Sequence, residues 1–155
     1  MSGTGHTVKS YEEEMQSLND NLVMMGSLTE NQMADAMAAV IKVDKESVDK
    51  IVKNDGKINE LRSTIDNQIT TVLVKRAPMA VDLRITISTM KISHDLERIG
   101  DLAKSVAKKV KPLPVDLPDE LIGSLRRLGD LVQKQLKDAL DAYLNKSKDL
   151  SLIHI

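Results

Sequence analysis

Apolar side chains recur at alternating steps of three and four residues along most of this chain, and this spacing strongly constrains its fold. A period near 3.6 residues places such side chains on one face of an α-helix. No alternating run bounded by turn residues predicts a strand. We therefore expect an all-α fold. The recurring positions of the first helix are Met15, Leu18, Leu22, Met25, Met33, Met37, Val40 and Ile41, and those of the third are Ile85, Ile92, Leu96, Ile99, Ala103, Val106 and Val110.

Polar residues and prolines divide the pattern into four helices. Asp44 is a capping residue before the second helix. Ala77 and Pro78 end that helix, because the residue before a proline avoids helical geometry. The segment Lys111–Pro118 holds three of the four prolines and predicts a linker. The predicted helices are about Ser10–Val43, Asp44–Ala77, Met79–Val110 and Asp119–Asn145.

Composition excludes several classes of function. The net charge of −1 and the absence of Trp and Phe leave neither a basic surface nor many rings for nucleic acid, so no nucleic-acid partner is expected. The absence of cysteine excludes disulfides and thiol catalysis. No apolar run approaches the roughly 18 residues of a membrane span, and the N-terminus lacks the pattern of a signal peptide. We expect a soluble cytoplasmic protein that does not insert into the membrane directly.

Two carboxylates lie one helical turn apart near the end of the predicted third helix. Glu97 and Asp101 are four residues apart, so they share one helix face. Carboxylates gain nothing from the helix dipole at this end, and paired carboxylate oxygens suit cations such as iron, manganese or magnesium. Alternatively, the pair is solvated and lies near Arg98 or Lys104. The spacing alone leaves both interpretations open.

Asp55 occupies a position of the second helix where the pattern calls for an apolar residue. A charge at such a position is costly unless it is paired or bound to a metal. Asp55 could pair with Arg62 or with a residue of another helix. It could instead be a metal ligand together with Asn59, which follows one turn later. Both interpretations remain open.

No motif of a known catalytic class is present. His94 and Glu97 form a single HxxE, whereas a ferritin-like di-iron site needs Glu-x-x-His on two helices. The phosphate-binding, nucleophile-elbow and zinc-protease motifs are absent. Nucleotide hydrolysis and nucleophilic catalysis therefore have no visible apparatus. A carboxylate-bridged metalloenzyme and a metal-free helical adaptor are both compatible with these absences.

The run from Arg76 to Asp101 resembles the PhoU family, the cytoplasmic regulators of phosphate transport systems. That resemblance implies tandem three-helix bundles, each with an E/DxxxD signature that binds metal ions. It implies Glu97 and Asp101 as metal ligands, accompanied by Asp55 and Asn59, with iron the first expectation and manganese, magnesium or zinc as alternatives. The residues that carry the resemblance are Pro78, Met79, Asp82, Leu83, Arg84 and the string DLERIGD at 95–101.

The resemblance also implies a domain organisation. Residues 1–111 would form an elongated up-down-up bundle, 112–118 a proline-rich linker, and 119–149 the first helix of an incomplete second bundle. Residues 150–155, LSLIHI, match the translation of a transposase library adapter, CTGTCTCTTATACACATC. We therefore expect the natural coding sequence to stop near Asp149 and residues 150–155 to be read-through of the adapter.

The function that the resemblance implies is negative regulation of phosphate uptake and of phosphate-starvation signalling. The protein would be a metal-binding adaptor between the phosphate ABC transporter and a membrane sensor histidine kinase. It would act by binding and not as an enzyme, and it would form a homodimer. Its location would be cytoplasmic, at the inner face of the membrane through its partners.

Overall fold

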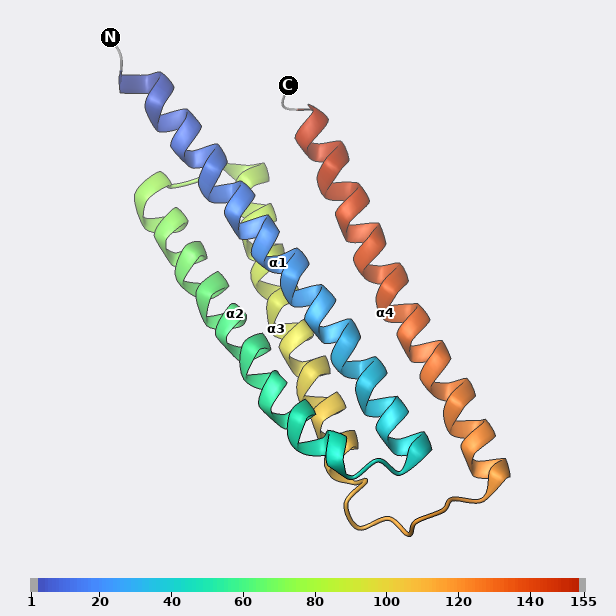
Figure 1. The fold of residues 1–155 in the computed structure, drawn as a ribbon. Coiled ribbons are helices and arrows are strands. Elements are labelled where there is room, and N and C mark those ends of the chain that lie inside the picture. Colours follow the sequence, from blue (N-terminus) through green and yellow to red (C-terminus); the bar gives the residue numbers. More distant parts are fainter. Residues whose placement is uncertain (1–2, 154–155) are drawn as a thin grey trace.

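Four long helices account for almost all of the structure (Figure 1). The computed structural model describes the backbone of residues 3–153 and the side chains of residues 5 and 7–146. Within residues 3–153 there is no strand, so the predicted all-α class is confirmed. The helices are α1 (Gly3–Lys42), α2 (Glu46–Arg76), α3 (Ala80–Lys108) and α4 (Asp119–Ile153).

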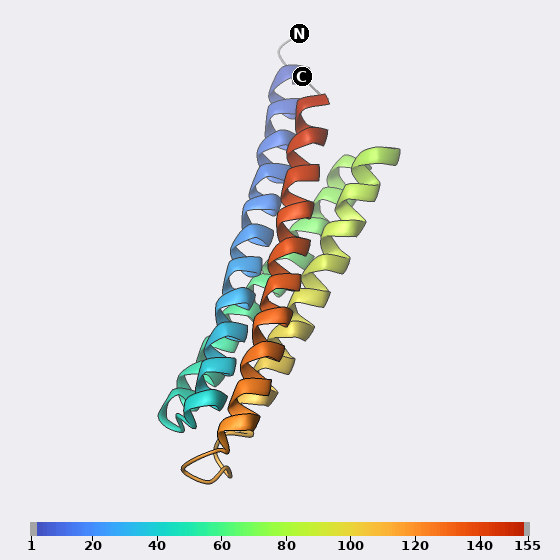
Figure 2. The same cartoon turned by 90° about the vertical axis from the view of Figure 1, so that its right-hand side faces the viewer.

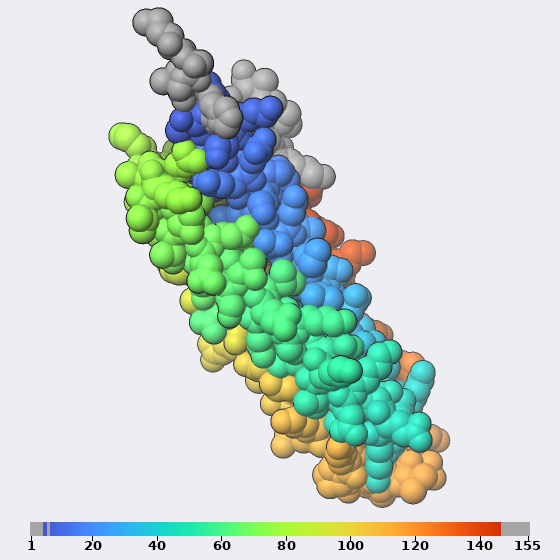
Figure 3. Space-filling model, turned by 60° about the vertical axis from the view of Figure 1, so that its left-hand side comes forward, coloured from blue at the N-terminus to red at the C-terminus, as the bar shows by residue number. Residues whose placement is uncertain are grey.

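Helices α1, α2 and α3 form the predicted up-down-up bundle. Each of the three packs against the other two, whereas the backbone of α4 approaches α1 and no other described helix. The two views in Figures 1 and 2 show α4 running alongside α1 at one side of the elongated bundle. On the opposite side, the side chains of α1 and α2 form a continuous surface (Figure 3). The fold is thus a three-helix rod with a fourth helix lying against it.

The helix boundaries differ from the prediction mainly at the ends of the chain. Helix α1 begins at Gly3 rather than near Ser10, and α4 continues to Ile153 rather than ending near Asn145. The proposed adapter-derived tail, 150–155, has its side chains outside the described residues. The breaks inside the chain lie close to where the polar residues and prolines predict them.

Left-handed backbone ends both α1 and α2. Val43 has a φ of 50°, and Ala77 has a φ of 41° and a ψ of 59°. The amide of Asp44 then bonds to the carbonyl of Ala39 at 2.9 Å, which closes the end of α1. The Asp44 carboxylate accepts from the Ser47 amide at 3.2 Å, which confirms the predicted capping role.

A buried polar layer separates two apolar clusters in the core. One cluster lies toward the α1–α2 turn and the other toward the α2–α3 turn. Gln32 on α1, Asp55 on α2 and Gly100 on α3 each lie between residues of the two clusters along their own helix. All three are buried. The first cluster comprises Met33, Ala36, Ala39, Val40, Val48, Ile51, Ala103, Ala107 and Val110; the second comprises Leu18, Leu22, Met25, Ile58, Ile65, Ile69 and Leu96.

The buried face of α3 is only partly the predicted one. Leu96 and Ala103 are buried as expected, but Thr86, Thr89 and Ser93 are buried where the sequence pattern favoured the neighbouring isoleucines. Each hydroxyl donates to a backbone carbonyl three or four residues earlier on the same helix, at 2.7 to 2.9 Å. Small side chains whose hydroxyls are satisfied locally can pack close to a neighbouring helix without a desolvation penalty.

Candidate functional site

Polar and charged side chains of α2 and α3 face one another along a single seam, which we call the polar ladder. On each helix they recur at steps of three or four residues, so they share one face. The two helices are antiparallel, so the order of residues reverses from one to the other. The members are Asp55, Asn59, Arg62 and Asp66 on α2, and His94, Glu97, Asp101 and Lys104 on α3.

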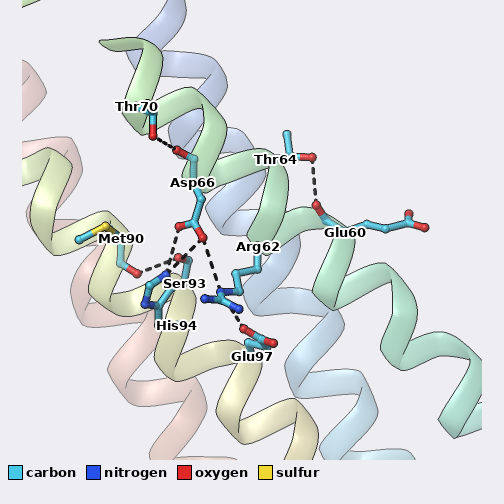
Figure 4. A network of polar contacts seen from close by, with 9 residues as sticks. All are labelled: Glu60, Arg62, Thr64, Asp66, Thr70, Met90, Ser93, His94 and Glu97. Carbon is cyan, nitrogen blue, oxygen red and sulfur yellow. Dashed lines mark hydrogen bonds and ion pairs between the residues drawn. The ribbon is translucent and has the colours of Figure 1, made fainter. Parts of the chain in front are cut away.

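The end of the polar ladder nearer the α2–α3 turn joins Asp66 and Arg62 to His94 and Glu97 (Figure 4). The Nε2 atom of His94 lies 3.1 Å from Oδ1 of Asp66. The Nε atom of Arg62 lies 2.8 Å from Oε2 of Glu97 and 3.6 Å from Oδ2 of Asp66. The Arg62–Glu97 contact is an ion pair without the alignment of a hydrogen bond. Arg62 therefore contacts one carboxylate from each helix.

The end nearer the α1–α2 turn is centred on Asp55, whose side chain is almost fully buried. Its Oδ2 accepts a hydrogen bond from Nζ of Lys104 at 2.7 Å, and its Oδ1 accepts one from Nε2 of Gln32 at 2.9 Å. The same Gln32 amide donates to the carbonyl of Gly100 at 2.8 Å. Asn59 donates more weakly to Asp55, at 3.3 Å. The buried carboxylate is thus both charge-paired and hydrogen-bonded, as a stable buried charge requires.

Lys104 also contacts the second carboxylate of the predicted metal motif. Its Nζ atom lies 3.2 Å from Oδ1 of Asp101. The hydrogen bond to Asp55 is the main cause that raises the pKa of Lys104 above its ordinary value, and Asp101 adds to it. The ammonium is therefore held charged between carboxylates from α2 and α3.

The four predicted metal ligands lie on one seam, yet their arrangement does not fit a metal ion. In favour of a site, Oδ1 of Asn59 is buried and has no hydrogen-bond partner. Against it, Asp55 and Asp101 contact Lys104, while Glu97 contacts Arg62. Among the side chains that the structure describes, no three or more carboxylates or histidines are placed to hold an ion together. Metal binding remains a prediction from the family resemblance.

Several partners in the polar ladder differ from the pairs considered from the sequence. Arg62 pairs with Glu97 and Asp66, not with Asp55. Asp55 instead pairs with Lys104, which is the inter-helix alternative. Sequence reasoning missed Gln32, although a polar residue between the apolar positions of the first helix was a usable signal.

Comparison with known proteins agrees with the architecture. Residues 22–110 match the family model described as the PhoU domain, a range that contains the whole polar ladder. The chain is 42% identical over 141 residues to a phosphate-specific transport system accessory protein PhoU homolog from Caulobacter vibrioides, covering 90% of this chain and 61% of that protein. It is 34% identical over 144 residues to the homolog of the same name from Clostridium acetobutylicum, covering 92% and 66% of the two proteins.

A solved structure shows the same fold. The crystal structure of PhoU from Pseudomonas aeruginosa superposes with a TM-score of 0.79 at 35% sequence identity, covering 92% of this chain and 68% of that one. The chain spans less than two thirds of the length of the curated relatives named above, 61% and 66%. The helix α4 lies beyond the residues that match the family model.

Proposed function

This chain belongs to the PhoU family, and from that premise we propose that it is a negative regulator of phosphate uptake and of phosphate-starvation signalling. The observation that carries the proposal is its identity to proteins named as accessory proteins of the phosphate-specific transport system, which extends over 90% of the chain. The family is one of regulatory accessory proteins and not of enzymes. The protein therefore acts by binding.

The partners that we propose are the phosphate ABC transporter and a membrane sensor histidine kinase. No described helix combines the length and apolarity needed to cross a bilayer. We place the protein in the cytoplasm, at the inner face of the membrane through these partners, and as a homodimer. A long bundle of packed helices suits such a role, because it presents a rigid surface whose binding costs little conformational entropy.

The mechanism that we propose is restraint by contact. When phosphate is plentiful, the bundle would contact both the transporter and the kinase and hold the kinase in its inactive state. Of the two kinds of adaptor considered from the sequence, the polar ladder favours the one without a metal, because its carboxylates are already paired with Lys104 and Arg62.

The proposal is tested by binding and by a reporter. The purified chain is titrated against the purified kinase cytoplasmic region and against the ATPase subunit of the transporter, with an unrelated three-helix bundle as the control. We expect saturable binding to at least one of them. In cells that lack their own homologue, the chain should lower expression of a phosphate-starvation reporter at high phosphate. Absence of binding to both partners would contradict the proposal.

A further inference from the structure

Two cationic side chains of the polar ladder each connect a carboxylate of α2 with a carboxylate of α3. Lys104 contacts Asp55 at 2.7 Å and Asp101 at 3.2 Å. Arg62 contacts Asp66 at 3.6 Å and Glu97 at 2.8 Å. A cation between carboxylates from two helices is also the arrangement that a bridging metal ion would produce.

The position of Lys104 is the more constrained of the two. Its carboxylate partner Asp55 is 2% exposed, and Gln32, itself 4% exposed, holds the other oxygen of that carboxylate. Gly100 accepts from the same Gln32 amide. The carboxylate is therefore fixed by the core, and the cation that neutralises it must lie at the place that the Lys104 ammonium fills.

We infer that Lys104 takes the place of a metal ion in this bundle, so that the buried carboxylate of Asp55 is neutralised by a cation that belongs to the chain. This inference is separate from the proposed regulatory function, since it concerns what holds α2 and α3 together. A divalent ion could bind Asp55 and Asp101 only by displacing the ammonium, because the two cations would repel each other at this distance. The wild-type bundle is therefore expected to fold and remain stable without metal.

The test measures the unfolding temperature of untagged protein in EDTA and in Mn²⁺, and its metal content by elemental analysis. For the wild-type chain we expect no metal above trace and the same unfolding temperature in both conditions. For Lys104→Met, which removes the ammonium and leaves Asp55 unpaired, we expect a lower unfolding temperature in EDTA. Mn²⁺ should restore part of it, because a ligand that binds only the folded state stabilises that state.

Two further variants are the controls. Lys111→Met removes the same kind of charge from an exposed pair with Asp49. Its unfolding temperature should be the same in EDTA and in Mn²⁺. Lys104→Arg keeps the charge and should behave as the wild type toward Mn²⁺.

Two results would overturn the inference. One is saturable binding of about one equivalent of Mn²⁺ to the wild-type chain, with a rise in unfolding temperature that Asp101→Asn abolishes. This measurement needs only folded wild-type protein and so remains decisive if Lys104→Met does not fold. The other is a folded Lys104→Met variant that gains no stability from Mn²⁺, which would show that Lys104 forms an ordinary ion pair and not a substitute for a metal.

Discussion

The Nε atom of Arg62 on α2 lies 2.8 Å from Oε2 of Glu97 on α3. Glu97 is one of the two carboxylates that the family resemblance implies as metal ligands, and its nearest charged partner is a guanidinium. The pair is partly exposed, with Glu97 22% and Arg62 38% exposed, so solvent screens the attraction.

A double-mutant cycle on Arg62→Ala and Glu97→Ala should give a coupling energy of about 0.5 to 1 kcal/mol, as expected for a partly exposed ion pair. Urea unfolding of the four proteins measures it. The coupling should decrease at high salt, because the pair is accessible to counterions. A coupling near zero at low salt would show that the contact contributes nothing to the bundle.

Replacing the buried carboxylate should destabilise the bundle far more than replacing an exposed one. Asp55→Ala leaves the Lys104 ammonium and the Gln32 amide without their common acceptor, and we expect a loss of about 3 kcal/mol in the free energy of unfolding. The matched control is Asp49→Ala, whose partner Lys111 is exposed and whose loss should cost at most about 0.5 kcal/mol. Chemical denaturation of both variants tests this, and equal losses would contradict the buried position of Asp55.

Two glycines should respond in opposite directions to replacement by alanine. At Gly56 a Cβ atom would meet nothing within 4 Å, so Gly56→Ala should stabilise α2 by about 0.5 to 1 kcal/mol through backbone entropy. At Gly100 a Cβ atom would lie 3.2 Å from Cδ1 of Ile58 and 3.5 Å from Oδ1 of Asp55.

Because Ile58 is buried and Asp55 is fixed by hydrogen bonds, neither can move freely, and Gly100→Ala should destabilise the protein by about 1 kcal/mol. Thermal unfolding of both variants provides the comparison. If Gly100→Ala were as favourable as Gly56→Ala, the close approach of α3 to α2 in the polar layer would be wrong.

Tyr11 should ionise unusually late. The pKa of its hydroxyl is raised to about 12, first by burial and then by the negative charges of Asp82 and Glu14. A pKa that is raised in the folded state contributes stability that is complete below the ordinary value of 10.0 and is lost as the pH rises toward 12.

The chain has two tyrosines, so Tyr143→Phe leaves Tyr11 as the single reporter. Its phenolate absorbance should appear only at the upper end of that pH range while the protein is folded. Unfolded Tyr143→Phe in denaturant is the control and should titrate near the ordinary value. Titration of the folded variant at the same pH as the unfolded one would contradict the burial of Tyr11 beside Asp82.

The helices and their breaks could be predicted from the sequence, since both follow from local chemistry. The spacing of apolar residues predicts helices, and Pro78 and the prolines after Lys111 predict where they end. The early start of α1 was not predictable in the same way, because the turn around Gly3 carries no acidic residue of the kind that marks a helix start.

The partners within the polar ladder could not be predicted, because they depend on the register between helices. The periodicity places Asp55 and Lys104 each on a face of its own helix, but it does not say that those faces meet. The unknown register between helices also explains the error on α3, where Thr89 and Ser93 are buried. Serine and threonine are usually exposed. Here the packing of α3 against its neighbours buries them, and their hydroxyls donate to carbonyls within the same helix.

The backbone of α4 approaches α1 and no other described helix. Detaching α4 would leave the contacts among α1, α2 and α3 intact, together with every residue of the polar ladder. Because the three-helix contacts do not include α4, local opening of α4 does not require global unfolding of the bundle. A binding event that displaces α4 would expose the flank of α1 that it covers and would also break the contact between the hydroxyls of Tyr143 and Thr89, which are 3.2 Å apart.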